Sequence, residues 1–184
     1  AELGNLLNEA AILAGKKNQK SITQEMIQKS IEKVVMGNEK KSLRMTEYEK
    51  RLTALHEIGH ALVGKMLAHT DPVHKISILP RGGAWGVTWF LPEKDRTYTS
   101  KAKYLDELAT LYGGRVTEEV FFGSEYVTTG ASSDIERATE IARAMIMRFG
   151  FDKDLWAENY APDSLEGNFL GGQAQEKAIS DETR

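Results

Sequence analysis

His56-Glu57-Ile58-Gly59-His60 places two histidines and a glutamate at helical spacing. Residues four apart lie on one face of a helix, so His56 and His60 can direct imidazole nitrogens at a single metal ion. Glu57 lies about 100° round the helix from His56, where its carboxylate can reach a water on the metal without binding the metal itself. The motif predicts a zinc site with a catalytic carboxylate, because zinc acidifies water and a nearby base can then remove its proton.

The residues around this motif favour a metal site over a chance pair of surface histidines. Ala54-Leu55 precede the motif and the apolar residues 61–63 follow it. Polar side chains in such surroundings cost free energy unless they find partners, and a metal ion is a natural partner for two imidazoles. The helix that carries them is expected from about Thr46 to Ala68, before the break at Asp71-Pro72.

Composition indicates a globular domain. The chain has 184 residues, of which 41% are hydrophobic and 28% charged, and its net charge is -3. No basic surface is predicted, and no nucleic-acid partner is expected. No apolar run approaches the roughly 18 residues of a membrane span. Cysteine is absent, so any zinc must be held by His, Asp or Glu.

The first part of the chain predicts two helices and a linker. Leucines and alanines at helical spacing indicate a helix over about 3–17. Thr23 is a good N-cap for a second helix, which should end at Gly37-Asn38. The charged residues 39–42 then read as a linker. We place a domain boundary here, which divides the chain into residues 1–37 and 38–184.

The remainder predicts a small sheet and two more helices, so the fold class is mainly α with a small β-sheet (α+β). Alternating residues bounded by prolines indicate two strands at hairpin distance, 75–79 and 85–91. Helical spacing returns over 100–122, interrupted by Gly113-Gly114, and again from a cap at Ser132 or Ser133 to Phe149. Residues 150–172 lack periodicity and read as loop.

A catalytic zinc normally has three protein ligands and one open position, and the residues leave the third ligand undecided. Met66 stands where a metzincin would have a third histidine. A thermolysin-like glutamate is excluded because the corresponding segment reads as strand and turn. His69 and His74 read as surface loop residues. Two acidic candidates remain, Glu118 and Asp134, and spacing alone does not separate them.

Several further motifs carry a family resemblance. In chain order they are residues 56–64 around the zinc motif, 71–78 with Pro80-Arg81-Gly82, Gly86-Val87-Thr88, Gly113-Gly114-Arg115 with Glu118-Glu119, and 129–131 leading to 134–139. Their order and spacing are far more specific than the zinc motif alone. The chain resembles the FtsH family of membrane-anchored AAA zinc metalloproteases over nearly its full length.

The resemblance implies a zinc-dependent endopeptidase site. Zn²⁺ would be bound by His56, His60 and Asp134, with Glu57 as general base. Glu118 would lie close to the metal and orient a ligand or a water. An edge strand that receives the substrate backbone would comprise Gly82, Gly83, Ala84, Trp85, Gly86 and Val87. An extended peptide on a sheet edge is held by main-chain hydrogen bonds, so recognition would depend little on substrate sequence.

The resemblance also implies a larger protein. Residues 38–184 would be a zincin-type peptidase domain, truncated at its C-terminus, and residues 1–37 the last two helices of an AAA lid. No Gly-rich loop followed by Lys-Ser/Thr occurs here, so ATP and Mg²⁺ are expected only in the missing ATPase core. The intact protein is expected to be a homo-hexamer at the cytoplasmic face of the bacterial inner membrane, or an organellar equivalent. It would be anchored through segments absent from this chain and would degrade unfolded and membrane polypeptides; this piece itself is expected to be soluble.

Two alternatives have other functions. One is a catalytically silent oligomerisation module in which zinc is structural, and the other is a helical adaptor without metal. Silent relatives usually lose the base or a ligand, whereas all four key residues remain here.

The chain departs from the family pattern at Ile58, where alanine is usual, at Trp85, where leucine is usual, and at Asn38, which replaces a common proline. Residues 151–169 match the pattern poorly.

Overall fold

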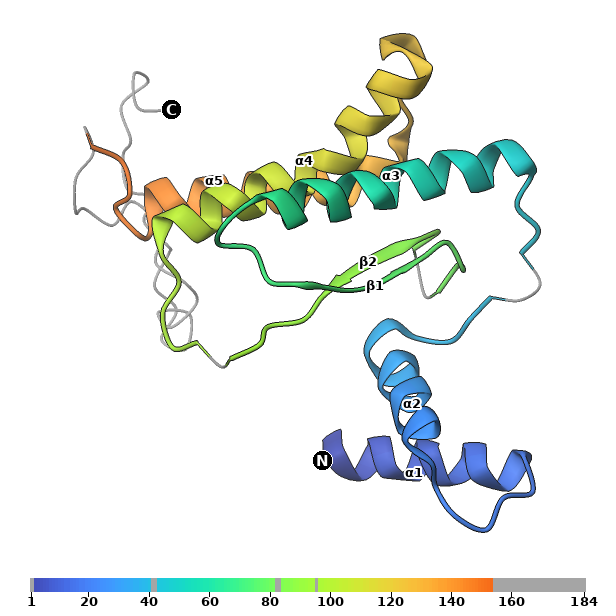
Figure 1. Ribbon diagram of the computed structural model, residues 1–184. Helices are drawn as coiled ribbons and strands as arrows, with labels where there is room; N and C mark the ends of the chain where they lie inside the picture. The colour runs from blue at the N-terminus through green and yellow to red at the C-terminus, as the bar shows by residue number, and fades with distance from the viewer. Residues whose placement is uncertain (1, 41–42, 82–83, 95, 154–184) are drawn as a thin grey trace, which may run out of the picture.

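The computed structural model describes residues 2–40, 43–81, 84–94 and 96–153 (Figure 1). In chain order its elements are α1 (Glu2–Lys16), α2 (Gln24–Met36), α3 (Glu47–Met66), β1 (Val73–Ser77), β2 (Val87–Phe90), α4 (Lys101–Phe122), the 3₁₀ helices η1 (Ser124–Tyr126) and η2 (Thr129–Ala131), and α5 (Ser132–Met147). The expected fold class, mainly α with a small β-sheet, is confirmed.

Helices α1 and α2 pack on each other as a small unit beside the rest of the chain (Figure 1). Ala10, Ala14 and Met26 are buried. Thr23 is the N-cap of α2, as expected, and its hydroxyl accepts a hydrogen bond from the backbone N–H of Met26. The division of the chain between residues 37 and 38 stays a prediction.

Helix α3 begins with a capping box. The Thr46 hydroxyl accepts from the N–H of Glu49, and the Glu49 carboxylate accepts from the N–H of Thr46 at 2.7 Å. Both bonds satisfy N–H groups that a helix start otherwise leaves unpaired. The helix ends at Met66, two residues before the expected end.

Helices α3 and α4 lie with their backbones in contact. A Cβ atom on Gly113 would come within 2.7 Å of the backbone oxygen of Gly59 and 3.2 Å of the Cα of His60. The expectation that Gly113-Gly114 interrupts the helix is wrong, because α4 runs continuously through both glycines. Glycine in a helix costs about 1 kcal/mol relative to alanine, and here the close helix approach offsets that cost.

Strands β1 and β2 form a two-stranded antiparallel sheet. The register runs from Val73↔Phe90 to Ser77↔Val87, with an irregularity between Val73 and Lys75. β1 lies earlier in the chain than the expected strand 75–79, and β2 is shorter than the expected strand 85–91. The alternation of residue types does not indicate which residues pair with the other strand. The sheet lies along α3, between that helix and the α1–α2 unit in the view of Figure 1.

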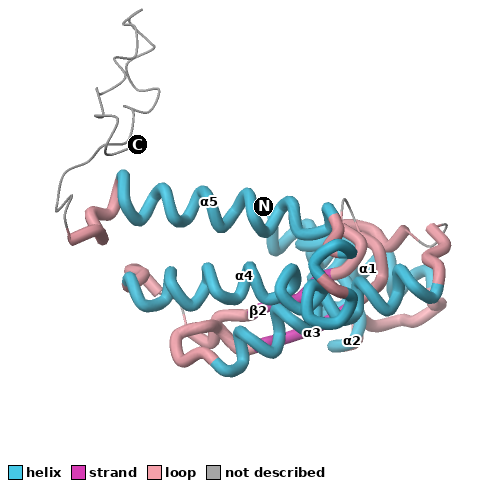
Figure 2. The backbone as a smooth tube through the Cα atoms, turned by 90° about the horizontal axis from the view of Figure 1, so that it is seen from above, coloured by secondary structure: helices cyan, strands magenta, loops and turns pink. Residues whose placement is uncertain are grey.

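Helix α5 lies along α4 (Figure 2). The expectation that Ser132 or Ser133 caps it is wrong: the N-cap is Ala131, which makes no side-chain cap hydrogen bond. The 3₁₀ helix η2 leads directly into α5, and the Thr128 hydroxyl caps η2 instead by accepting from the N–H of Gly130. The helix ends at Met147, before the expected end at Phe149.

Most of the loop expected over 150–172 lies outside the described residues, which end at 153. Among the helices that the structure describes, none is long and apolar enough to cross a membrane.

Candidate metal centre

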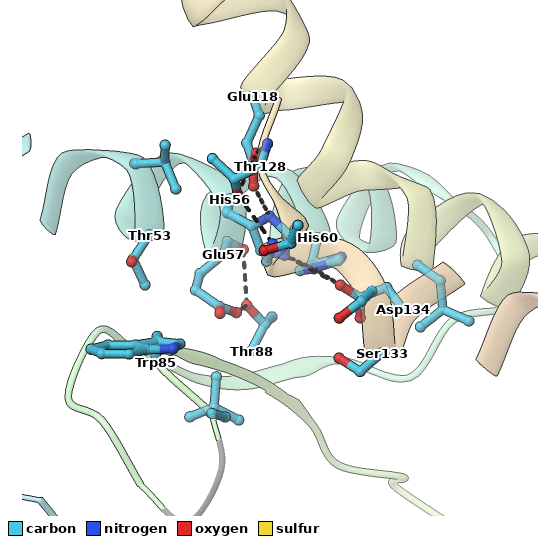
Figure 3. Close-up of a pocket in the computed structure, with 18 of the residues that line it drawn as sticks. Thr53, His56, Glu57, His60, Trp85, Thr88, Glu118, Thr128, Ser133 and Asp134 are labelled. Atoms are coloured by element: carbon cyan, nitrogen blue, oxygen red, sulfur yellow. Dashed lines mark hydrogen bonds and ion pairs between the residues drawn. The ribbon is translucent and has the colours of Figure 1, made fainter. Parts of the chain in front are cut away.

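Three side chains from two helices converge on one point (Figure 3). Helix α3 supplies His56 and His60, both buried, and the first turn of α5 supplies Asp134. The two Nε2 atoms are 3.0 Å apart, and Oδ2 of Asp134 lies 3.3 Å from Nε2 of His56 and 3.5 Å from Nε2 of His60. Ligands about 2.0–2.2 Å from a tetrahedral zinc are separated by about 3.3 Å. The three atoms therefore have the spacing of a zinc ligand set.

The hydrogen bonds behind the imidazoles also fit a metal. Nδ1 of His60 lies 2.8 Å from the backbone oxygen of Thr110. A carbonyl oxygen only accepts, so this Nδ1 carries the proton and the neutral ring presents the Nε2 lone pair to the centre. Nδ1 of His56 faces the Glu118 carboxylate at 2.7 Å, which favours the same tautomer. Two lone pairs and a carboxylate oxygen then face one another, an arrangement that a cation stabilises.

Glu118 lies on the Nδ1 side of the His56 ring, opposite the Nε2 atom that faces His60 and Asp134. Its side chain is fully buried and both oxygens are occupied. Oε1 faces Nδ1 of His56, while Oε2 accepts from the backbone N–H of Thr128 at 2.9 Å and from its hydroxyl at 3.1 Å. Geometry thus separates the two acidic candidates, since only Asp134 has an oxygen beside both Nε2 atoms.

The electrostatics of the centre are those of a cation site. Burial by itself raises the pKa of the Asp134 carboxyl, but hydrogen bonds with His56 and His60, which form when a proton takes the place of a metal ion between these groups, outweigh it and lower that pKa to about 2. Burial by itself lowers the pKa of His56, yet its hydrogen bonds with Asp134 and Glu118 raise the pKa above the ordinary value of 6.5. A positive charge between these side chains is therefore favoured.

Glu57 lies next to the ligand group, on the side of α3 that faces the sheet. Burial raises the pKa of its carboxyl, and the Thr88 hydrogen bond and the two imidazoles only partly oppose this rise. Its Oε2 lies 2.6 Å from the hydroxyl oxygen of Thr88 (Figure 3). A carboxylate with a raised pKa close to a metal has the properties of a general base.

A cleft of about 1000 Å³ opens onto this centre. The expected substrate strand borders it from Ala84 to Val87, and Gly82 and Gly83 lie outside the described residues. The Trp85 ring lies across the cleft from Glu57 (Figure 3) and is 49% exposed. The cleft therefore lies between the candidate metal ligands and the segment that leads into β2.

The chain matches the family model described as peptidase family M41 over residues 43–184. It belongs to peptidase family M41. It is similar over all 184 residues to proteins named ATP-dependent zinc metalloprotease FtsH: 46% identical in Photobacterium profundum, 45% in Cupriavidus metallidurans and 45% in Haemophilus influenzae. The chain spans only 26%, 28% and 29% of the lengths of these three proteins.

Membership in family M41 confirms the resemblance to FtsH metalloproteases. The chain carries a metallopeptidase domain, and Zn²⁺ is the cofactor that fits both the family and the cluster of two imidazoles and a carboxylate. The matched region contains the whole ligand group and every described residue of the cleft.

The other two histidines of the M41 domain have separate partners. Nδ1 of His69 lies 3.0 Å from Oδ2 of Asp106. His74 packs edge-on against Trp89, with ring centroids 5.0 Å apart. The expectation that both are loop residues is wrong for His74, which belongs to β1, because the strand begins at Val73.

Sequence reasoning missed three residues that shape the centre: Thr88, Thr110 and Gly114. A Cβ atom on Gly114 would lie 2.5 Å from Nε2 of His56 and 2.6 Å from Nε2 of His60. The one available signal was a glycine pair inside a helical pattern, which indicates close packing as well as a break. The role of Thr110 rests on its carbonyl, which no side-chain pattern reveals.

Proposed function

We propose that this chain is the endopeptidase domain of an ATP-dependent, FtsH-like protease that hydrolyses peptide bonds in unfolded and membrane polypeptides. His56, His60 and Asp134 hold Zn²⁺, and Glu57 is the general base. One observation carries the proposal: two Nε2 atoms and a carboxylate oxygen lie within 3.5 Å of one another, beside a second carboxylate at an open cleft.

The chain's own residues have distinct tasks in the reaction. Bound Zn²⁺ supplies Lewis acidity, which polarises the scissile carbonyl and makes water a stronger acid. Glu57 accepts the proton of the attacking water and delivers it to the leaving amine nitrogen as the C–N bond breaks. Its raised pKa suits this exchange, because a carboxyl that holds a proton more readily serves in both directions.

Two supporting groups keep the imidazoles in place. Glu118 holds His56 through Nδ1, and the Thr110 carbonyl holds His60 in the same way. Such partners fix the tautomer and ring orientation, and their removal typically weakens metal affinity by about 10–100-fold.

The substrate binds as an extended strand along residues 82–87, of which 84–87 border the cleft. Main-chain hydrogen bonds to a strand edge require a substrate segment with free N–H and C=O groups. Folded proteins seldom expose such segments, which favours unfolded chains as substrates. Gly86, which has no side chain, borders the cleft beside Glu57.

We infer the remaining properties of the whole protein from the family resemblance; the ATP dependence is also supported by the relatives, which are named ATP-dependent zinc metalloproteases. Residues 1–37 belong to an AAA lid whose ATPase core lies outside this chain. The intact protein is a homo-hexamer, anchored in the bacterial inner membrane or an organellar equivalent, with this domain on the cytoplasmic face. ATP hydrolysis in that core delivers polypeptide to the cleft.

The substitution Glu57→Gln tests the proposal. Cleavage of dye-labelled casein by the zinc-loaded protein should fall by about 10²–10⁴-fold, while bound zinc stays at about one per chain. Glu119→Gln, at an exposed neighbour of Glu118, is the control and should leave cleavage unchanged. A wild-type protein that binds zinc and assembles but cleaves nothing would support the silent oligomerisation module instead.

A further inference from the structure

The hydroxyl of Thr88 joins strand β2 to the carboxylate of Glu57. Oγ1 lies 2.6 Å from Oε2 of Glu57 and 2.8 Å from the backbone oxygen of the same residue (Figure 3). Thr88 is paired with Ile76 in the sheet, so its backbone is held in place independently of α3. Sheet and catalytic helix are therefore linked at the residue assigned as the base.

The Thr88 hydroxyl has one proton to donate, and of its two neighbours on Glu57 the carboxylate is a stronger acceptor than the backbone oxygen. The Glu57 carbonyl lies in the interior of α3, where the N–H four residues later already satisfies it. A charged acceptor forms a shorter and stronger hydrogen bond, typically about 2.5–2.7 Å between the oxygens. The 2.6 Å separation fits donation from Thr88 to Oε2.

A second residue, Gly86, confines the rest of the Glu57 side chain. Gly86 immediately precedes β2 and, like Thr88, lies against α3. A Cβ atom on Gly86 would come within 2.5 Å of Oε1 of Glu57 and 2.8 Å of its Cγ. The Glu57 stem thus packs against bare backbone, with one oxygen bound to Thr88 and the other over the segment proposed to bind substrate.

We propose that Thr88 is a positioning residue of the peptidase reaction, whose hydroxyl holds the Glu57 carboxylate in the orientation that receives the proton of the attacking water. The proposal rests on the proposed role of Glu57 as general base. Without the hydroxyl the Glu57 carboxylate samples several rotamers, and only a fraction of them can receive the proton of the attacking water. We therefore expect kcat to fall by about tenfold. KM stays within about twofold, because Thr88 acts on Glu57 and not on ground-state binding.

Three variants test this proposal. Thr88→Val keeps the β-branched shape and loses the hydroxyl, Thr88→Ala is a second variant without a hydroxyl, and Thr88→Ser keeps it. We expect kcat for a quenched fluorogenic peptide to fall about tenfold in the first two and to stay within about threefold in the serine variant. Zinc content should be unchanged in all three. The proposal would be overturned if the valine and alanine variants had the same kcat as the wild type. It would also be overturned if kcat fell as much in the serine variant as in the other two.

Crystal structures of the zinc-loaded wild type and Thr88→Val provide a readout that does not depend on activity. We expect one Glu57 rotamer bonded to residue 88 in the wild type, and a displaced or divided carboxylate in the variant. An unmoved Glu57 in the variant would overturn the positioning role, even in an active peptidase. A wild type that cleaves no peptide would instead overturn the proposed function, while the two crystal structures would still decide whether Thr88 orients Glu57.

Discussion

Nδ1 of His56 lies 2.7 Å from Oε1 of Glu118, a carboxylate that is fully buried. This contact accounts for an acidic residue that is close to the metal centre yet outside its ligand group. Glu118 engages the far nitrogen of the ring, and Asp134 meets the near one at 3.3 Å. In the proposed zinc site the two carboxylates would therefore have different roles: Glu118 would orient the imidazole of His56, and Asp134 would bind the same metal ion as that imidazole.

Substitution of Gly114 should disable the metal centre without removing a ligand. In Gly114→Ala the new Cβ would lie 2.5 Å from Nε2 of His56 and 2.6 Å from Nε2 of His60. Both rings must move, so the zinc dissociation constant should rise by at least about tenfold, as measured by competition with a chromophoric chelator. Gly4→Ala is the control, because nothing lies within 4 Å of its added Cβ. Equal zinc affinity in both variants would show that the helices adjust without cost.

Gly113 should be required for stability more than for metal binding. The Cβ atom of Gly113→Ala would lie 2.7 Å from the backbone oxygen of Gly59, and neither helix backbone can yield easily. We expect a loss of about 3 kcal/mol in the free energy of unfolding, measured by urea denaturation. Gly15→Ala, where added volume meets open space, should instead stabilise α1 by up to about 1 kcal/mol. A neutral Gly113→Ala would contradict the close helix contact.

These glycines also illustrate what the sequence could predict. Helical periodicity predicted α3 and the convergence of His56 and His60, because i and i+4 positions share a face in any helix. The same periodicity misread Gly113-Gly114 as a break, since local propensity contains no information about a neighbouring helix. Spacing alone could not choose between Asp134 and Glu118, because the choice depends on which ring nitrogen of His56 each carboxylate reaches. The family resemblance supplied the ligand set that spacing left open.

The helix caps show the same difference between features set by neighbouring residues and features set by the tertiary fold. Thr23 and the Thr46–Glu49 capping box obey local rules, and both are present. The start of α5 does not follow those rules, because η2 already continues into the helix and leaves the serines without a capping role. The Thr88–Glu57 contact joins residues 31 apart in the chain and was beyond any local pattern.

Acidification should release zinc from the centre. Zinc binds the deprotonated imidazole, so protons compete with it as the pH falls through the pKa of His56, which lies above 6.5 in the metal-free protein. Asp134, whose pKa is lowered to about 2, stays ionised throughout this range. Zinc affinity should therefore be steady at pH values above the pKa of His56 and decline by up to about tenfold per pH unit below it, for His56 alone. A zinc titration from pH 8 to pH 5 checks this, and a constant affinity would contradict it.

The contact between the first two helices and the peptidase domain should depend on Arg81. Its buried guanidinium lies 3.1 Å from Oε2 of Glu32 in α2 and 2.6 Å from Oε1 of Glu39 in the linker. Arg81→Met leaves these carboxylates without that cation, and we expect a loss of about 3 kcal/mol in stability. Limited proteolysis between α2 and α3 should accelerate in parallel.

The control for Arg81 is Lys29→Met, which removes an exposed ion pair with Glu25 on the same helix. Exposed pairs contribute little, so stability should change by less than about 0.5 kcal/mol. Equal effects of the two substitutions would contradict a specific role for the Arg81 contacts.

Zinc per chain, measured by elemental analysis after dialysis against a weak chelator, tests the metal centre most directly. The comparison includes the wild type, Asp134→Ala, Glu118→Gln, and Glu136→Ala as an exposed control on α5. We predict about one zinc in the wild type, in Glu118→Gln and in Glu136→Ala, and loss of zinc in Asp134→Ala. Zinc retained without Asp134 and lost in Glu118→Gln would contradict the ligand set, and a wild type without zinc would contradict the metallopeptidase assignment itself.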